Sequence, residues 1–327
     1  MKAVVVKSPG GADQLAMGEV PAPVPQADEL LVRVRAAALN RADILQREGN
    51  YPPPPGASEI LGLDMAGIVE GAGAGCTRFE AGGRVCGLLP GGGYAEYAVL
   101  PESLAIPIPE GWNFEQAAAV PEVFLTAFQT LFWIGRLAAG ERVLVHAGAS
   151  GVGTAAIQLA REAGATVLTT AGSEEKCAAC RELGAAAAVN YREGPFAGKV
   201  LEATGGEGVD LILDFVAAPY LEQNLSVLRT DGRLVLISTL GGGKVDGFRL
   251  GTLIAKCLQI TGTTLRSRSV EYKARLTREF MEFALERFAR GALKPVVDST
   301  FPWEKAAEAH RWMEANRNVG KIVLTVG

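Results

Sequence analysis

Histidine and cysteine are scarce in this chain of 327 residues. It has two histidines, His146 and His310, and an odd, scattered set of five cysteines, which argues against a disulfide framework. Cys177 and Cys180 form a C-x-x-C, but they lie in a segment of helical composition with no second pair nearby. We interpret them as thiols on one helix face rather than as a metal or redox site.

Long apolar runs and blocks of basic charge are also absent. No uncharged apolar stretch reaches the length of about 18 residues that a membrane span needs. The net charge is −4, and no lysine or arginine cluster suggests a nucleic-acid surface. The apolar run of the first seven residues is too short for a signal peptide and is typical of a first strand. We therefore expect a cytoplasmic protein that binds neither membranes nor nucleic acid.

Glycine is plentiful, and three glycines stand where a short apolar strand gives way to a helix. Val143–Val145 is followed by Gly148, Gly151 and Gly153, and apolar residues then recur at helical spacing from residue 154. Such a turn lets the backbone approach a pyrophosphate, which the free N–H groups at the helix start then bind. The sequence therefore predicts dinucleotide binding by Gly148, Ser150, Gly151, Val152 and Gly153, although the spacing departs from G-x-G-x-x-G.

The tip of the next strand, 165–170, distinguishes between the two nicotinamide cofactors. NAD-binding folds carry an acid about 20 positions past the glycine turn, but here the strand ends in Ala171-Gly172-Ser173. Ser173, Lys176 and the later Tyr191 offer donors to a 2′-phosphate, whereas Glu174 and Glu175 would repel it. We predict NADPH; the alternative is that Ser173 is only a helix cap.

The organisation of the chain changes near residue 121. Residues 1–120 show short strand-like segments at 30–36, which alternates, and at 67–70, 83–87 and 95–100, separated by Pro and Gly clusters, which predicts an antiparallel β-domain. Strands and helices then alternate, which predicts a doubly wound parallel sheet. The expected strands are 142–147, 165–170, 186–189, 209–214, 232–238 and 258–263, and the helices between them are 152–163, 174–183, 219–228 and 248–256. Helices at 122–133, 271–290 and 306–315 and a strand at 321–326 complete the expected elements of this part of the chain.

Several segments, in this order, resemble the zinc-free quinone oxidoreductases of the medium-chain dehydrogenase/reductase superfamily, most closely the p53-inducible quinone oxidoreductase type. They are 38–43 (ALNRAD), 51–58 (YPPPPGAS), 89–93 (LPGGG), 146–158 (HAGASGVGTAAIQ), 264–268 (TLRSR) and 320–324 (GKIVL). The resemblance implies an α/β fold. A GroES-like β-rich catalytic domain, 1–120 completed by 266–327, would carry an inserted Rossmann NADPH-binding domain, 121–265. It also implies an active site in the cleft between the domains and a homodimer paired through 258–263, with a tetramer as the larger possibility.

Zinc-dependent relatives carry a ligand cysteine early in the first domain and a Gly-His-Glu segment later. The matching positions here are Ala37–Asn40 and Gly62–Asp64, which offer neither a thiolate nor an imidazole. A tetrahedral N/S site cannot readily be assembled from them. We therefore expect no metal, and without a Lewis acid alcohol dehydrogenation is disfavoured.

The resemblance also implies site residues. Tyr51 and Ser150 would be catalytic, a positioned hydroxyl assisting the acceptor oxygen that gains charge. A loop aromatic and a turn residue, respectively, are the alternative interpretations. The positions that would contact the cofactor beyond the glycine turn and strand tip are Asn40, Asp43, Thr126, Leu240, Gly241, Thr263, Thr264, Leu265 and Asn316. Asn40 could instead be a helix cap.

The expected activity is hydride transfer from NADPH to a quinone or another electrophilic carbonyl. One alternative is an NADPH-dependent enone or enoyl reductase on the same scaffold, with Tyr51 as the proton donor. Another is a crystallin-like protein that binds NADPH without turnover. A panel of quinones, enones and aldehydes distinguishes these functions.

Overall fold

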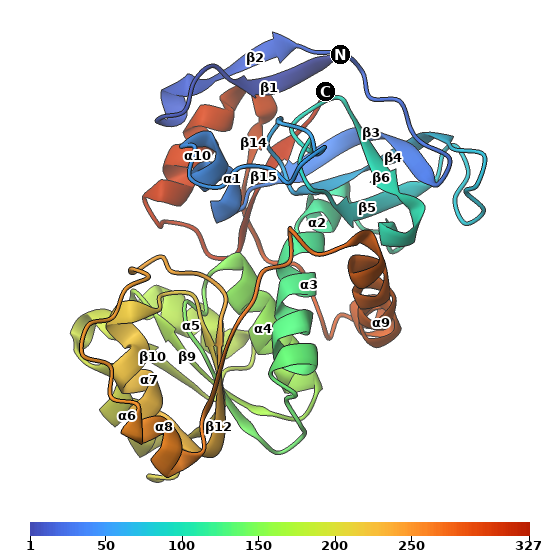
Figure 1. Cartoon of the computed structure of the whole chain (residues 1–327). Helices are drawn as coiled ribbons and strands as arrows, with labels where there is room; N and C mark the ends of the chain where they lie inside the picture. The colour runs from blue at the N-terminus through green and yellow to red at the C-terminus, as the bar shows by residue number, and fades with distance from the viewer. The chain divides into compact units, whose positions relative to one another are not determined.

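The computed structural model describes all 327 residues, and the chain divides into two compact units. One unit combines Met1–Leu125 with Leu265–Gly327, and we call it the β-rich unit; the other is Thr126–Thr264, which we call the nucleotide unit. Figure 1 traces the chain through both units, from blue at the N-terminus to red at the C-terminus.

The β-rich unit is built on a seven-stranded sheet in the order β14-β15-β3-β4-β5-β7, with β6 also paired to β3. The long strand β3 alternates buried and less buried side chains, as expected for a half-buried strand. The last strand of the chain, β15, runs antiparallel to β3 and pairs Val323 with Ala38. The strands are β1 (Lys2–Val6), β2 (Leu15–Glu19), β3 (Glu29–Ala38), β4 (Asp64–Ala72), β5 (Arg84–Leu88), β6 (Tyr97–Pro101), β7 (Ile106–Pro107), β14 (Val297–Pro302) and β15 (Lys321–Thr325).

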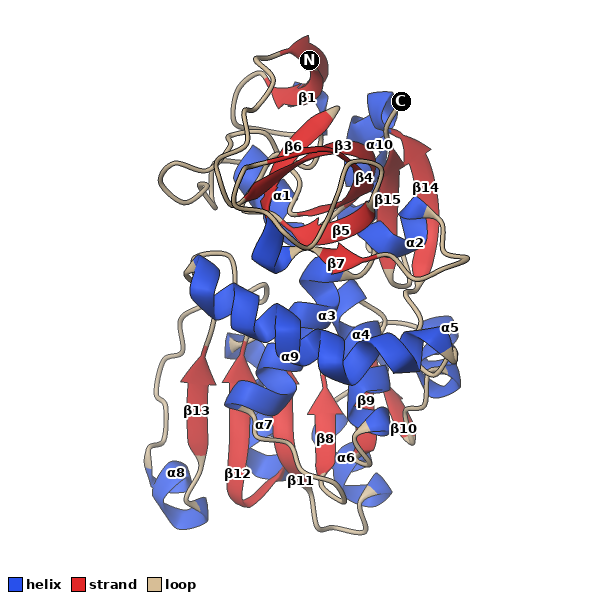
Figure 2. Ribbon diagram, turned by 90° about the vertical axis from the view of Figure 1, so that its right-hand side faces the viewer, coloured by secondary structure: helices blue, strands red, loops and turns tan.

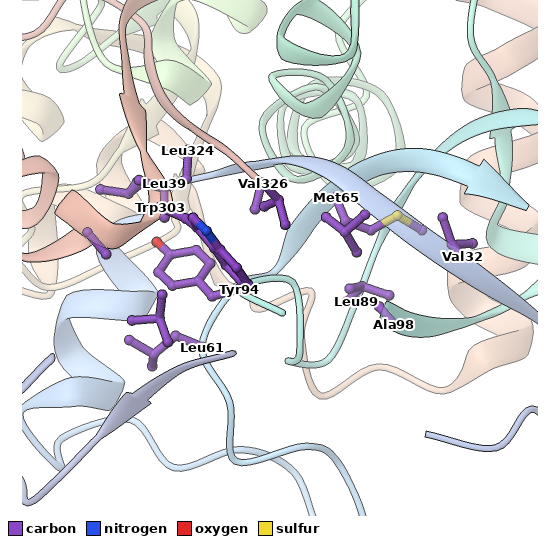
Figure 3. Close-up of a cluster of buried hydrophobic side chains, with 14 of the residues drawn as sticks. Val32, Leu39, Leu61, Met65, Leu89, Tyr94, Ala98, Trp303, Leu324 and Val326 are labelled. Carbon is purple, nitrogen blue, oxygen red and sulfur yellow. The ribbon is translucent and has the colours of Figure 1, made fainter. Parts of the chain in front are cut away.

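The helices of the β-rich unit are short except for one. They are α1 (Arg41–Arg47), α2 (Phe114–Ala118), α9 (Val270–Ala289) and α10 (Ala306–Glu314), with 3₁₀ turns η1 (Ala12–Gln14), η2 (Glu102–Leu104) and η6 (Trp303–Lys305). A single core contains residues from both parts of the chain, and Figure 3 shows a portion of it, including Tyr94, Met65, Trp303 and Leu324. Burial of this shared core is what ties the C-terminal segment to the first 125 residues.

An apolar helical run, Phe114–Ile134, is long enough to cross a membrane by length and composition, but 78% of its most apolar window is buried inside the protein. It comprises α2, α3 (Pro121–Phe128) and the π-helical turn η3 (Gln129–Ile134). Burial of that extent is typical of a core helix.

The nucleotide unit is a six-stranded parallel sheet in the order β10-β9-β8-β11-β12-β13 (Figure 2). Its first strand, β8, is central, so the order reverses between β8 and β11, where ligands of doubly wound sheets bind at the carboxyl ends. The elements are β8 (Arg142–Val145), α4 (Gly151–Glu162), β9 (Thr166–Ala171), α5 (Glu174–Glu182), β10 (Ala187–Asn190), η4 (Tyr191–Glu193), α6 (Phe196–Ala203), β11 (Val209–Asp214), η5 (Ala218–Tyr220), α7 (Leu221–Val227), β12 (Leu228–Leu236), α8 (Gly251–Lys256) and β13 (Gln259–Gly262).

The predicted α/β class and parallel sheet are confirmed, and the six strands lie where they were expected to within a few residues. The sequence interpretation missed helix α6. Pro195 before it and Gly198 within it are turn signals, but Phe196 and Val200, one turn apart, are both buried and hold the helix on the sheet. The short or half-exposed strands β2, β7 and β14 were also missed.

Candidate functional site

A glycine turn joins the central strand β8 to helix α4. A Cβ built on Gly148 would lie 1.9 Å from Thr169 Oγ1 on β9, and one built on Gly153 would lie 2.3 Å from the carbonyl oxygen of Ala147. Ala147 has a left-handed φ of 49°. Only glycine therefore lets this turn close against β9 and bring the start of α4 to the carboxyl end of β8.

Ser150 is the N-cap of α4, and its Oγ accepts a hydrogen bond of 3.1 Å from the Gly153 N–H. The N–H groups of Gly151 and Val152 come next and have no carbonyl of their own helix to bind. Such N–H groups, with the partial positive charge of a helix start, suit a phosphate. The Ser150 hydroxyl is thus used locally, as the turn-residue alternative expects, here as a helix cap, and its O–H can still donate to a ligand.

The tip of strand β9 brings three of the predicted phosphate-binding residues together. Ser173 is the N-cap of α5, with its Oγ 3.3 Å from the Lys176 N–H. A Cβ built on Gly172 would lie 2.7 Å from the hydroxyl of Tyr191, so that hydroxyl packs over the strand tip. Tyr191 is 41% exposed, which leaves its ring accessible to a ligand.

The two glutamates beside Ser173 behave differently. Glu174 forms an ion pair with Arg181, two turns further along helix α5. Glu175 accepts a hydrogen bond from the Ser173 hydroxyl, and this bond lowers the pKa of its carboxyl group. The strand tip therefore has no acid of its own but does have one carboxylate within reach, which opposes a bound phosphate.

A buried polar network fixes the strand ends behind the glycine turn. His146 Nδ1 lies 2.9 Å from Thr170 Oγ1, and its Nε2 lies 2.7 Å from Asn224 Oδ1. Asn224 Nδ2 donates to Asp214 Oδ2 at 2.9 Å, so Asn224 Oδ1 accepts the proton of a neutral imidazole. Burial lowers the pKa of His146, and the neighbouring Asp214 carboxylate partly offsets this shift. This histidine positions β8, β9 and β11.

The other predicted residues of the nucleotide unit lie mainly at strand ends. Leu240 and Gly241 follow β12, and their N–H groups donate to the carbonyls of Phe215 and Val216, the two residues just after β11. Thr263 follows β13, and its Oγ1 accepts from Gln129 Nε2 at 3.3 Å. Thr126 begins the unit and is 5% exposed. Leu240 is 56% exposed, which makes it available to a ligand or partner.

In the β-rich unit, Asn40 and Asp64 bind a buried ammonium group. Lys321 Nζ lies 2.7 Å from Asn40 Oδ1, 2.8 Å from Asp64 Oδ2 and 2.7 Å from the Leu39 carbonyl oxygen. Asn40 Nδ2 donates to Asp64 Oδ2 at 2.9 Å, and the Glu122 N–H donates to Asp64 Oδ1 at 2.6 Å. Asn40 also begins helix α1, so its capping alternative and its buried amide contacts coexist.

Asp43 lies at the end of a second buried network of hydrogen bonds. Its carboxylate accepts from the N–H groups of Asn40 and Gly62, at 2.7 and 3.0 Å, and Tyr94 Oη lies 3.3 Å from Oδ2. His310 Nε2 is 3.3 Å from Tyr94 Oη. Burial raises the pKa of Asp43 to about 6. Burial, together with the nearby Asp43 carboxylate, also raises the pKa of Tyr94 far above its usual value.

Arg47 lies at the other end of this hydrogen-bond network. Arg47 Nη1 lies 3.3 Å from His310 Nδ1, and its Nη2 donates to Glu314 at 2.6 Å. Since arginine only donates, His310 Nδ1 accepts and the imidazole carries its proton on Nε2. Burial, reinforced by Arg47, lowers the pKa of His310 to about 3.

Tyr51 lies beside an arginine that the sequence interpretation did not single out. The guanidinium carbon of Arg266 is 5.2 Å from the centre of the Tyr51 ring, and its Nη1 lies 3.4 Å from the Tyr51 carbonyl oxygen. Arg266 also donates to Gln46 Oε1 at 2.7 Å and to the Pro90 carbonyl. The arginine therefore fixes the position of the Tyr51 loop.

The remaining predicted residues are separated between the units. Asn316 has a left-handed φ of 51° and accepts from Arg41, so its side-chain oxygen is engaged inside the β-rich unit. Leu265, the first residue of the returning segment, is 6% exposed. Thr264 is the last residue of the nucleotide unit.

Sequence reasoning missed Lys321, Tyr94 and Arg266. Of these three, only Lys321 could have been recognised from the sequence, because it is a charged residue at the start of an apolar strand. Across all 327 residues, no three His, Cys, Asp or Glu side chains are grouped as a metal ion would require.

Comparisons with known proteins cover the whole chain. Residues 26–110 match the family of alcohol dehydrogenase GroES-like domains, and residues 151–282 match the family described as zinc-binding dehydrogenase. A quinone oxidoreductase of Rattus norvegicus is 35% identical over 330 residues, which covers 99% of this chain and 97% of the relative.

Solved structures agree in fold. The Escherichia coli quinone oxidoreductase complexed with NADPH has a TM-score of 0.89 at 29% identity, covering 99% of this chain and all of the other. A structure described as an NAD-dependent alcohol dehydrogenase has the same TM-score at 35% identity, with full coverage of both chains. The α/β fold is thus a GroES-like domain with a Rossmann-type sheet, and the chain belongs to the quinone oxidoreductases of the medium-chain dehydrogenase/reductase superfamily.

Proposed function

We propose that this protein is an NADPH-dependent quinone reductase that works without a metal ion. The nucleotide unit binds NADPH and supplies Ser150, and the β-rich unit supplies Tyr51. NADPH, when bound, supplies the hydride. The observation that carries the proposal is the pairing of a capped helix start at the glycine turn with a strand that ends in no acid, where Ser173 caps α5 one turn before Lys176 and the Tyr191 hydroxyl packs over Gly172.

Two sets of groups bind the phosphates in this proposal. The N–H groups of Gly151 and Val152 receive the pyrophosphate, because the closed turn at Gly148 and Gly153 places them at the carboxyl end of β8. Ser173, Lys176 and Tyr191 receive the 2′-phosphate. Glu175 has to release the Ser173 hydroxyl when the phosphate binds, and this reduces the preference for NADPH without reversing it.

The chemistry of the available donor groups argues against a zinc ion at this site. At the positions that match zinc ligands, Asn40 offers an amide and Leu63 offers no donor. The Asp64 carboxylate is occupied by Lys321, Asn40 and the Glu122 N–H. Zinc would have to displace a buried ammonium group and find nitrogen or sulfur ligands that the site does not contain. Quinones do not need such a Lewis acid, because they are already strongly electrophilic.

Tyr51 and Ser150 are the proposed catalytic residues. Each has a hydroxyl that can donate to the acceptor oxygen as it gains negative charge. Arg266, which lies over the Tyr51 ring, lowers the conformational freedom of that loop and so pre-positions the donor. The residues proposed to contact the rest of the cofactor are Asn40, Asp43, Thr126, Gly172, Leu240, Gly241, Thr263, Thr264, Leu265 and Asn316.

The assembly is proposed to be a cytoplasmic homodimer. Strand β13 is the edge of its sheet, and most of its residues are exposed. Nearby, Ile254 is 79% exposed and Leu250 is 64% exposed. Pairing two copies of β13 would cover an open edge that otherwise invites aggregation. Analytical ultracentrifugation tests this.

Cofactor titration by fluorescence tests the binding site. Wild-type protein is expected to bind NADPH at least about tenfold more tightly than NADH, and Lys176→Ala is expected to remove most of that difference. Lys244→Ala, an 89% exposed lysine elsewhere in the unit, is the matched control and should change neither affinity. Glu175→Gln should tighten NADPH binding alone. Equal affinities in the wild type would refute the assignment.

NADPH oxidation against ortho-quinones, para-quinones, enones and aldehydes tests the reaction itself. We expect turnover with quinones to exceed that with the other acceptors. A preference for enones would instead identify an enone reductase, and tight NADPH binding without turnover of any acceptor would identify a binding protein.

A further inference from the structure

A cavity of about 300 Å³ lies within the β-rich unit, and none of the residues proposed above for catalysis or cofactor binding lines it. Its walls are the loops at 56–58 and 90–92, part of strand β6 at 97–99 and the first turn of helix α9. Apart from Glu29, Ser58, Tyr97 and Lys273, the lining side chains are apolar or glycine. This volume and lining are typical of a site for a small organic molecule.

Lys273 is a buried cation in the wall of this cavity. It is 7% exposed, and its Nζ donates one hydrogen bond, of 3.1 Å, to the Arg266 carbonyl oxygen. An ammonium group has three hydrogens, so two remain for another acceptor. Glu29, the acid in the lining, accepts from the Gln26 N–H at 2.9 Å and forms no ion pair with Lys273.

A second buried cation lies next to it. Arg266 is 6% exposed and donates only to neutral oxygens, those of Gln46, Tyr51 and Pro90. Burial and the neighbouring Arg266 both lower the pKa of Lys273. Buried lysine and arginine are almost always paired with acids, because removing their charge from water is costly. Neither Lys273 nor Arg266, however, forms an ion pair with an acid, although Asp43 acts on Arg266 from a distance.

We infer that the cavity binds an amphipathic carboxylate, with its head group on Lys273 and its apolar body in the cavity. A carboxylate supplies the missing negative charge and accepts the two unused hydrogens. The mostly apolar lining selects a medium-chain or aromatic body over a small polar anion. Val270 and Lys273 lie one helical turn apart on α9, so head and body would meet the same helix face.

Calorimetric titration of the full-length protein, without NADPH or quinone, tests the inference independently of the proposed function. The probes are octanoate, octanol, octylamine and acetate. Octanoate is expected to bind with a dissociation constant of about 1 mM or tighter, and the other three at least about tenfold more weakly. Comparable affinities for octanoate and octanol would overturn the inference, as would the absence of saturable binding of octanoate.

Two variants locate the site. Lys273→Met keeps the length of the side chain, removes a buried cation and should weaken octanoate binding about tenfold or more. Lys273→Arg keeps the charge and should retain binding. Ala57→Phe fills the cavity while leaving Lys273 in place, and should also abolish binding. If Lys273→Met and Ala57→Phe, both verified as folded by their thermal transitions, bind octanoate as tightly as wild type, the site is not this cavity.

Discussion

Lys321 Nζ and Asp64 Oδ2 lie 2.8 Å apart, with side chains that are 3% and 0% exposed. Lys321 opens the final strand β15, and Asp64 opens β4, 257 residues earlier. The pair therefore ties the C-terminal segment to the middle of the sheet. A lysine ammonium here binds the oxygen atoms that surround the positions where zinc-dependent relatives carry metal ligands.

Replacing Lys321 by Met is expected to destabilise the protein by about 3–5 kcal/mol, because Asp64 would keep a buried charge without a partner. The double variant Lys321→Met, Asp64→Asn should recover much of this loss, since it removes both charges and keeps an acceptor for the buried donors of Asn40 and Glu122. Urea unfolding measures both. The exposed pair Lys199–Glu193 is the control, and Lys199→Met should cost less than about 1 kcal/mol. A cost as small for Lys321→Met would contradict the role assigned to the buried pair.

His310 should make the protein sensitive to acid. Its pKa is about 3 in the folded state and about 6.5 when unfolded, so the unfolded chain binds a proton more readily between these values. The stabilisation is complete above pH 6.5 and is lost as the pH falls toward 3, by about 5 kcal/mol in all.

His310→Gln, which cannot titrate, should therefore flatten the wild-type loss of stability between pH 6.5 and 3, as measured by urea unfolding at each pH. Asp43 works in the opposite direction: its raised pKa of about 6 contributes stability at low pH that is lost as the pH rises from about 4 to 6. An unchanged slope in His310→Gln would show that other groups dominate acid unfolding.

Ser150→Ala is expected to cost about 1 kcal/mol of stability, because the Gly153 N–H loses its cap. Ser150→Thr retains a capping hydroxyl and is the matched control. If Ser150 also donates to the acceptor, Ser150→Ala lowers kcat beyond what its stability loss explains. Thermal unfolding and steady-state kinetics on the same samples separate the two roles, and an unchanged kcat would restrict Ser150 to capping.

Tyr51→Phe is expected to slow quinone turnover about 10- to 100-fold while leaving NADPH affinity within about twofold of wild type. The ring remains in place beneath Arg266, so only the hydroxyl is lost. Stopped-flow kinetics with a fluorescence titration give both values. Turnover at the wild-type rate would mean that Tyr51 only lines the site.

Local sequence patterns were sufficient to predict those strands and helices whose apolar residues recur at the spacing of their buried face. The alternation in β3 and the apolar run of β8 predicted strands, and Gly148 and Gly153 predicted the turn that their packing requires. Patterns failed for α6, where tertiary burial of Phe196 and Val200 outweighs Pro195 and Gly198. The role of Ser173 as a cap was predicted from its place before a helix, whereas the cap role of Ser150 was not.

The sequence alone therefore determined the α/β class, the parallel sheet, the glycine turn and the absence of an acid at the tip of β9, because each depends on residues close together in the chain. Only the tertiary structure decided that Lys321 neutralises Asp64, that Arg266 lies over Tyr51, and that His310 joins Arg47 to Tyr94. These contacts join residues 215–263 positions apart, and folding selects them because buried charges and polar groups need partners. No local periodicity encodes which partner each group finds.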